Sequence, residues 1–398
     1  MTSRAERVRG CLLGGAIGDA LGAPVEFDSG QSILAAHPER LRTFVSGTAG
    51  WPAGSITDDT QMTLFTIEGI LRGGGTAVAE AYDRWLDTQL LPAPPASASG
   101  LAAEPWLYAR RAPGNTCLSA LSTARADGRI GSPAVNDSKG CGGVMRVAPY
   151  GLLDIPPRQS FDGAVEAAAY THGHPTGQLS SGALAALLNH LTAGTPLDAA
   201  LDAVLTLLAT YPNHQETTAA LLAARELAAE VASAAGAGHL AGLKYPAAPE
   251  EQVDDEAPIA VEQVGGAAPA SAGQDAVGPG LDGAASALVG ELAAGRVEEL
   301  GGGWVGEEAL AIGVYAALVV PGPEHVLEGL ALAVSHGGDS DSTGAIAGNV
   351  LGALYGEGWL PVGLGAGVEG RGVLAGLAEG LLGVQAAPGD GAGEAAGA

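Results

Sequence analysis

HGGDSDST, residues 336–343, places two carboxylates and several hydroxyls immediately before an apolar helical pattern. A second stretch of the same kind, SITDDT at residues 55–60, also opens an apolar pattern, although it lies far away in the sequence. The spacing Ser55-x-x-Asp58 fits a capping box, which is a purely structural explanation. A cap needs only one acid, however, and each stretch offers two. We therefore interpret both stretches as turns at helix starts whose acids can point at one site.

The residues around these two stretches are typical of helices. Ala and Leu, both strong helix formers, fill most apolar positions, and aromatic residues make up only 4% of the chain. Strand-like alternation of β-branched residues is scarce. The pattern predicts an all-α fold, a compact multi-helix domain. Apolar residues at helical spacing predict helices at residues 4–21, 58–71, 164–170, 177–191, 197–211 and 217–235.

The composition changes between residues 245 and 283, where Pro, Gly, Ala and acidic residues dominate. No Lys or Arg occurs between Lys244 and Arg296. We interpret this stretch as a flexible acidic insertion in a single domain that spans residues 1–385. A disordered Gly- and Ala-rich tail is expected at residues 386–398. A boundary between two domains is the alternative explanation of the acidic stretch.

The chain carries a formal net charge of −26, with 18 basic and 44 acidic side chains. Such a surface repels nucleic-acid phosphates, so duplex binding is not expected. The three cysteines are widely spaced, which excludes a disulfide framework and a Cys-x-x-Cys zinc pattern. No apolar run is long enough to span a bilayer, and charged residues interrupt the first positions. We expect a cytoplasmic monomer without a membrane segment.

Four aspartates would crowd together if the two helix starts faced each other. Their mutual repulsion would raise the pKa of some of them unless cations intervened. Carboxylate and hydroxyl oxygens select hard ions, and neither stretch supplies the His and Cys residues that zinc prefers. The sequence therefore predicts a pair of divalent cations, Mg²⁺ or Mn²⁺, which together could activate a water molecule.

Two further segments could contact a ligand. Gly140, Gly142 and Gly143 would let the backbone approach it closely, and successive amides in such a loop can form an anion-binding nest. A plain glycine turn is the alternative. His172 is an isolated histidine, and such a residue is more often packed or capping than functional.

Five blocks in a fixed order give the chain a resemblance to a known family. They are GGAIGDALG at 14–22 with Glu26 just after it, TDDT at 57–60, KGCGGVMR at 139–146, THGHP at 171–175 and HGGDSDSTG at 336–344. Outside the acidic insertion and the tail, most of the chain resembles the ADP-ribosylglycohydrolases, including the dinitrogenase-reductase-activating type and the ADP-ribosylarginine hydrolases. The resemblance implies an all-α fold with a dinuclear metal centre between the two acidic stretches.

Carried over position by position, the resemblance implies two sets of site residues. The metal ligands would be Thr57, Asp58, Asp59, Asp339, Asp341 and Ser342. ADP-ribose would be bound by Gly140, Gly142, Gly143, Val144, Met145, His172 and Trp304. Trp304 would stack on adenine, an ordinary core position being the alternative. Ser342 is a Thr in some relatives and a Ser in the arginine-type enzymes, which slightly favours an arginine-linked substrate.

The implied activity is hydrolysis of the bond between ADP-ribose and its acceptor, in the first place an arginine of an ADP-ribosylated protein. Asp59 and Asp341 are the candidates for proton transfer, and Glu26 is a candidate acid at the mouth of the site. Asp19 would support the site or be purely structural. Other acceptors are alternatives: serine, a nucleic-acid base, or a small conjugate such as O-acetyl-ADP-ribose. Other classes are an ordinary glycosidase carboxylate pair, a non-catalytic ADP-ribose-binding protein and a structural protein that kept the fold.

Overall fold

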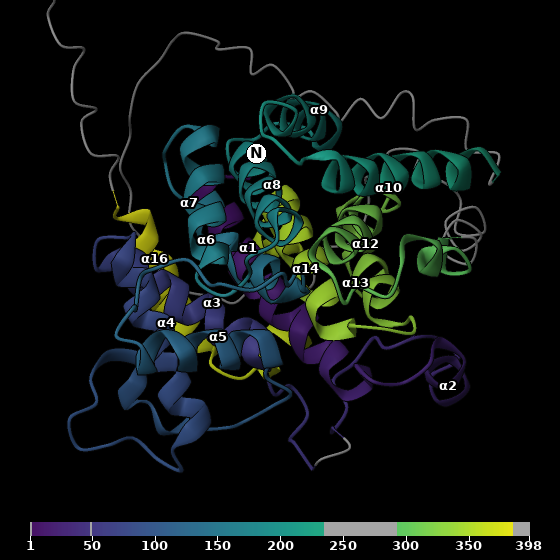
Figure 1. The fold of residues 1–398 in the computed structure, drawn as a ribbon. Coiled ribbons are helices and arrows are strands. Elements are labelled where there is room, and N and C mark those ends of the chain that lie inside the picture. Colours follow the sequence, from purple (N-terminus) through teal and green to yellow (C-terminus); the bar gives the residue numbers. More distant parts are fainter. Residues whose placement is uncertain (1, 48–49, 235–292, 385–398) are drawn as a thin grey trace, which may run out of the picture.

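The computed structural model describes residues 2–47, 50–234 and 293–384 (Figure 1). The segments expected to form an acidic insertion at 245–283 and a tail at 386–398 lie outside the described residues. Helices from both sides of residues 235–292 contribute to one hydrophobic core, in which Leu221 and Tyr315 are both buried.

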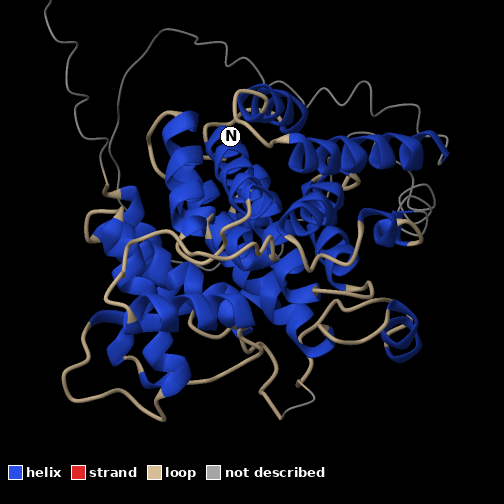
Figure 2. Ribbon diagram, in the orientation of Figure 1, coloured by secondary structure: helices blue, strands red, loops and turns tan. Residues whose placement is uncertain are grey.

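Helices make up the regular secondary structure, and no strand occurs among the described residues (Figure 2). This confirms the predicted all-α class. The helices are α1 (Arg4–Gly22), α2 (Gly30–Ala36), α3 (Asp58–Leu71), α4 (Thr76–Leu90), α5 (Asn115–Ala126), α6 (Ala148–Gly151), α7 (Pro157–Ala169), α8 (Pro175–Thr192), α9 (Leu197–Leu208), α10 (Gln215–Ala234), α12 (Gly306–Leu318), α13 (Val326–Val334), α14 (Ser340–Tyr355), α15 (Val362–Gly367) and α16 (Arg371–Leu382). A short 3₁₀ helix, η4 (Cys141–Arg146), covers most of the glycine-rich block.

The predicted helix boundaries are most accurate where a cap is visible in the sequence. The first helix and α3 match their predictions within one residue. By contrast, α7 begins at Pro157 rather than at residue 164, and α8 begins at Pro175 rather than at residue 177. Both helices place a proline at their first position, where its missing N–H costs nothing. The prediction located these helices and placed both starts too late.

Helices α1 and α14 pack against each other through facing glycines, at the centre of the fold (Figure 1). A Cβ atom added to Gly18 would lie 1.8 Å from the carbonyl oxygen of Gly344, and one added to Gly14 would lie 2.2 Å from that of Gly348. A turn further along, Gly10 faces Gly352 in the same way. No side chain fits between the two backbones at these levels. The glycines therefore set both the spacing and the register of the two helices.

This register has a direct consequence for the acidic residues. The last turn of α1 carries Asp19, and the facing end of α14 is its start, where Asp341 lies. Gly22 of α1 would, with a Cβ atom, collide with the backbone of Ser340 and Asp341. The close contact thus holds the start of α14 against the end of α1.

The central helices are buried on nearly all sides. Every residue of α14 is buried, as is almost every residue of α8 and α12. Helices that are apolar all round occur either in the core of a large protein or in a membrane. None of the described helices is long and apolar enough to cross a membrane.

Candidate active site

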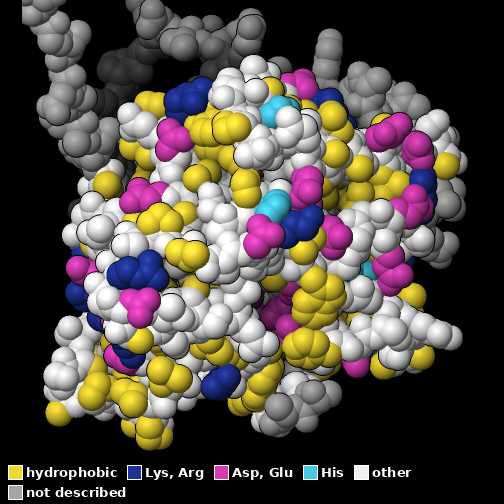
Figure 3. All heavy atoms as spheres, in the orientation of Figure 1, with side chains coloured by type: hydrophobic (Ala, Val, Ile, Leu, Met, Phe, Trp, Pro, Cys, Tyr) yellow, Lys and Arg dark blue, Asp and Glu magenta, His cyan; other side chains and the backbone are white. Residues whose placement is uncertain are grey.

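A cleft of about 620 Å³ opens where the starts of α3 and α14 meet the glycine-rich block. Figure 3 shows the molecule hollowed near the centre of one face, with acidic side chains inside the hollow and hydrophobic side chains along its edge. Every site residue expected from the sequence lines this cleft except Thr57, Gly143 and Val144. The two acidic stretches, far apart in the chain, therefore meet at one place.

The start of α3 is capped by Thr57 and not by Ser55. The Thr57 hydroxyl accepts a hydrogen bond from the Asp59 amide at 3.3 Å, so the capping-box interpretation of Ser55 and Asp58 was wrong. Since Thr57 takes the cap, Asp58 and Asp59 fall in the first helical turn, where the helix dipole favours negative charge. Asp58 accepts a further hydrogen bond from the Gly114 amide at 3.2 Å.

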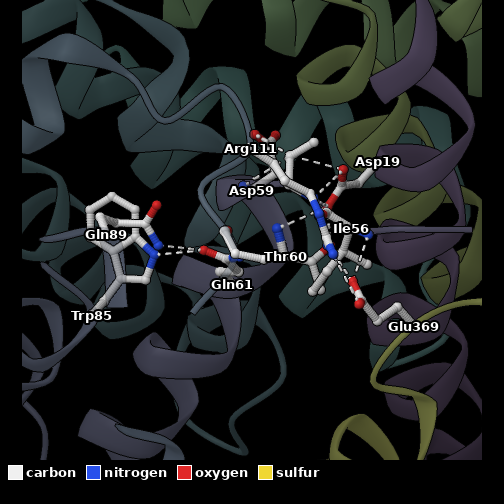
Figure 4. Close-up of polar contacts among 11 residues, drawn as sticks. Asp19, Ile56, Asp59, Thr60, Gln61, Trp85, Gln89, Arg111 and Glu369 are labelled. Atoms are coloured by element: carbon white, nitrogen blue, oxygen red, sulfur yellow. Dashed lines mark hydrogen bonds and ion pairs between the residues drawn. The ribbon is translucent and has the colours of Figure 1, made fainter. Parts of the chain in front are cut away.

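Asp19 of α1 ties this helix start to the centre of the fold (Figure 4). Its carboxylate accepts hydrogen bonds from the amides of Thr57 and Thr60, each at 3.1 Å, and from both of their hydroxyls. Burial, and after it the nearby Asp341, raise the pKa of Asp19 to about 7. Asp19 therefore positions the α3 acids, which answers the question that the sequence left open about its role.

The start of α14 is shaped by a close backbone contact. Gly338 has φ +157°, and a Cβ atom on it would lie 2.0 Å from the carbonyl oxygen of Gly302. The same carbonyl accepts the Asp339 amide at 2.8 Å. Asp339 therefore lies just before the helix and Asp341 in its first turn, so that both face the cleft. The Cys141 thiol donates to Asp339 Oδ2 at 2.6 Å.

Burial and mutual repulsion act on all of these carboxyl groups. The pKa values of Asp58, Asp59 and Asp339 are raised well above the ordinary value, by burial first and by Asp341 next. Burial also raises the pKa of Asp341. The same two causes raise the pKa of Glu26 to about 11. No positively charged side chain pairs with any of these acids within the described ranges.

This donor set fits hard divalent cations. Glu26, Asp339 and Asp341 each offer an oxygen within 4.8 Å of the others. Asp59 Oδ1 and Glu26 Oε2 are buried without a hydrogen-bond partner among the described residues. Buried carboxylate oxygens normally have partners, so the two orphaned atoms indicate room for a ligand. Oxygen donors of this kind suit Mg²⁺ or Mn²⁺ better than zinc.

The glycine-rich block is less open than a nest of successive amides would require. The Gly140 amide donates to Ser138 Oγ at 3.3 Å, and the Cys141 amide donates to the Trp304 carbonyl at 3.1 Å. The Gly142 amide lies in the first turn of η4, where amides lack a partner inside the helix. The Gly142 amide therefore remains as the donor that this block can offer to an anion.

Two residues of this block that were expected to contact the ligand do not line the cleft. A Cβ atom on Gly143 would lie 3.0 Å from the Gly177 carbonyl oxygen, so this glycine allows η4 to approach α8. Val144 is fully buried, and neither residue lines the cleft. The resemblance marked Gly143 because glycines that serve packing and glycines that serve binding look alike in a motif, and it marked Val144 by its place in the same block.

The aromatic residue of the site is exposed. Trp304 has 45% of its surface exposed and lies at the cleft, so it is not an ordinary core tryptophan. Phe27, 74% exposed, stacks on it with ring centroids 5.8 Å apart. Sequence reasoning missed Phe27, although its place directly after Glu26 was a usable signal. It also missed Arg110, which lines the cleft and has no distinguishing pattern around it.

Several known proteins are similar to this chain in sequence or in fold. A profile of the ADP-ribosylglycohydrolase family matches residues 1–391. The chain is 28% identical over 198 residues to ADP-ribosyl-[dinitrogen reductase] glycohydrolase of Rhodospirillum rubrum, and 32% identical over 153 residues to an uncharacterized protein of Archaeoglobus fulgidus. These matches cover 49% and 37% of the chain, and 60% and 43% of the two relatives, so the chain spans about half the length of the curated relatives it matches.

A solved structure described as an ADP-ribosylglycohydrolase-related protein complex has a similar fold. It aligns with a TM-score of 0.56 at 23% identity and covers 96% of this chain and 98% of its own. At this identity the likeness concerns the fold alone. The family profile, in contrast, extends over nearly the whole sequence and includes all of the blocks that form the cleft. The chain therefore belongs to the ADP-ribosylglycohydrolase family.

Proposed function

We propose that this protein hydrolyses the bond between ADP-ribose and an acceptor, in the first place an arginine side chain of a modified protein, with the help of two divalent cations. The observation that carries the proposal is the meeting of Asp58, Asp59, Asp339 and Asp341, from two helix starts, on the floor of one cleft. Unpaired buried acids in such number destabilise a fold unless bound cations offset their charge.

The proposed cation ligands are Thr57, Asp58, Asp59, Asp339, Asp341 and Ser342. Thr57 does not line the cleft, yet its hydroxyl proton goes to Asp19 at 2.9 Å, which leaves an oxygen lone pair available. Bound cations would lower the pKa of a coordinated water molecule and so supply a nucleophile near neutral pH.

Binding of an anionic ligand by a chain of charge −26 requires local contacts. The open amide of Gly142 and the ring of His172 lie together on one wall of the cleft, where we place the phosphates. Trp304 and Phe27 offer exposed ring faces for the adenine, since stacking needs no charge. Arg110, exposed at the rim, adds the positive charge that the floor lacks.

Three acids were candidates for proton transfer, and their surroundings separate them. Asp59 Oδ1 has no hydrogen-bond partner among the described residues, so it is the atom free to accept a proton. Asp341 Oδ1 already accepts from the Ser342 amide at 3.0 Å, which suits a positioning role better. Glu26, buried at the cleft with an unpartnered Oε2, is the candidate to donate a proton to the departing acceptor.

Release of ADP-ribose from an arginine-ADP-ribosylated protein, with Mg²⁺, Mn²⁺ or EDTA, tests the proposal. We expect release that depends on the cation and is lost in Asp58→Ala/Asp341→Ala. The matched control is Asp154→Ala, which removes an exposed acid away from the cleft and should change nothing. Parallel assays on serine-linked substrate and on O-acetyl-ADP-ribose identify the acceptor. If the cation-loaded protein released ADP-ribose from none of the three, a non-catalytic binding protein would replace the hydrolase.

The predictions of a single domain, a monomer and a cytoplasmic location concern properties outside the cleft. They stay predictions.

A further inference from the structure

A buried arginine side chain lies behind the wall of the cleft, and the proposed reaction does not use its charge. Arg146, in η4, is fully buried and forms no ion pair with a carboxylate in the described part of the chain. Its guanidinium stacks on the Tyr82 ring at 4.4 Å and donates to the Cys117 thiol at 3.2 Å. It also donates to the Thr171 hydroxyl at 2.6 Å. Burial of a guanidinium without a carboxylate partner costs free energy, so its presence here needs a structural or functional explanation.

The Thr171 hydroxyl connects this cation to His172. A hydroxyl has one proton to donate, and Thr171 Oγ1 already accepts from Arg146. Its own proton can go to His172 Nδ1 at 2.8 Å, to the Ala168 carbonyl oxygen at 3.4 Å, or to the neighbouring Cys117 sulfur, which is a weak acceptor. The shorter contact is a normal O–H···N hydrogen bond and the longer one is weak. The hydroxyl therefore donates to Nδ1, and in a neutral ring this leaves the proton on Nε2.

The opposite edge of the imidazole faces the glycine-rich block. Cβ atoms added to Gly140 or Gly142 would each lie 3.4 Å from His172 Nε2. His172 lines the cleft, and none of the described residues forms a hydrogen bond with Nε2. Burial, and after it the charge of Arg146, lower the pKa of His172 to about 3. The ring is therefore uncharged at neutral pH.

We propose that Arg146 and Thr171 are positioning residues, which hold His172 as an uncharged Nε2–H donor beside the Gly142 amide. This N–H donates to an oxygen of bound ADP-ribose, an assignment that rests on the proposed function. The guanidinium cannot lose its proton, so one lone pair of Thr171 Oγ1 always accepts from Arg146, and donation to Nδ1 gives the hydroxyl proton its shortest acceptor. The wall of the cleft thus presents two neutral donors, the Gly142 amide and His172 Nε2–H. The Arg146 guanidinium orients the second of them without touching the ligand.

The tautomer can be measured without turnover. The chain has eight histidines, so ¹⁵N-histidine labelling gives a countable set of imidazole signals, and His172→Gln identifies the one that belongs to His172. At neutral pH we expect Nδ1 of His172 to show the shift of an unprotonated nitrogen and Nε2 that of a protonated one. Thr171→Val, which keeps the shape and removes the hydroxyl, should give a mixture of tautomers, and Thr171→Ser should restore the wild-type signal.

The same variants can be compared in their affinity for ADP-ribose, measured by calorimetry on the cation-loaded protein. Loss of one oriented hydrogen bond predicts about threefold to tenfold weaker binding for Thr171→Val, and Thr171→Ser should bind as the wild type does. Thr192→Val is the matched control, because it removes a buried hydroxyl that bonds only to backbone carbonyls of Gly151 and Asn189. It should leave both the tautomer and the affinity unchanged.

The outcomes separate this inference from the proposed function. An Nδ1–H tautomer in the wild type would overturn the relay even if the protein releases ADP-ribose, and so would a Thr171→Val spectrum identical to the wild type. An Nε2–H tautomer in a protein that does not bind ADP-ribose would overturn the assignment of the ligand and count against the hydrolase. The wild-type spectrum alone decides the relay if Thr171→Val does not fold.

Discussion

Replacing Gly18 with alanine tests whether facing glycines set the spacing of α1 and α14. The new Cβ atom would lie 1.8 Å from the Gly344 carbonyl oxygen, whereas a carbon and a carbonyl oxygen in contact stay about 3.3 Å apart. The helices would therefore have to separate locally by about 1.5 Å. Overpacking of this kind costs about 3 kcal/mol at the upper end of its usual range, and the better helix propensity of alanine returns about 1 kcal/mol.

The expected result for Gly18→Ala is thus a free energy of unfolding about 2 kcal/mol lower than that of the wild type. Gly376→Ala is the matched control, since Gly376 lies in α16 with no atom within 4 Å of an added Cβ. Without a clash, it should stabilise the protein by about 1 kcal/mol. Urea unfolding followed by helical circular dichroism measures both variants, and the slopes of the two curves should agree with the wild type.

A second measurement connects this packing to the site. Displacement of α14 moves Asp341 away from Asp19 and the α3 acids, so Mn²⁺ affinity should fall about tenfold in Gly18→Ala and stay unchanged in Gly376→Ala. If Gly18→Ala were as stable as the wild type, the close contact would not exist in solution and the explanation of the register would be refuted. If it were unstable but bound Mn²⁺ normally, the register would not position the acids.

Three more predictions concern the cleft. The raised carboxyl pKa values mean that the folded chain binds more protons than the unfolded chain, so without cations the melting temperature should fall as pH rises from 5 to 8. Mn²⁺ should raise the melting temperature more at pH 8 than at pH 5, and by the same amount in the control Asp154→Asn as in the wild type. The increase should be smaller in Asp58→Asn, and an unchanged increase there would contradict the site. Trp304→Ala should weaken ADP-ribose binding by about 1–3 kcal/mol of lost stacking, measured by calorimetry, and the exposed Trp359→Ala should not. Asp19→Asn cannot accept from all four donors of the two threonines, so urea unfolding should show a loss of about 1–3 kcal/mol, and an unchanged stability would remove Asp19 from its supporting role.

The sequence was informative where a residue type has one dominant physical use. Two acids with hydroxyl neighbours at a helix start have few structural explanations, and the structure places both pairs in one cleft. The bounds of α3 were correct because Thr57, Asp58 and Asp59 mark a helix start whichever of them forms the cap. The sequence did not identify the capping residue itself, because Ser55 and Thr57 offer the same oxygen and only the backbone path selects between them.

Residues with several possible uses could not be assigned from the sequence. Gly142 and Gly143 are neighbours, yet one lines the cleft and the other lets η4 approach α8. Arg146 follows a motif for ligand contacts but points into the core, where its partners come from three other segments. Such assignments depend on contacts between distant parts of the chain, and no local pattern contains them.

Two sets of uncharged contacts explain how the chain tolerates its own site. Crowded, buried carboxylates oppose folding, and cations can offset this only after the site has formed. The acids must therefore be brought together by interactions that carry no charge of their own. The facing glycines of α1 and α14 provide backbone contact, and the threonine donors around Asp19 provide hydrogen bonds. The same logic applies at the cleft wall, where Arg146 acts through a hydroxyl and leaves His172 uncharged. In the ranges that the structure describes, the four aspartates on the floor of the cleft have no cationic side chain beside them, and neutral contacts hold them together.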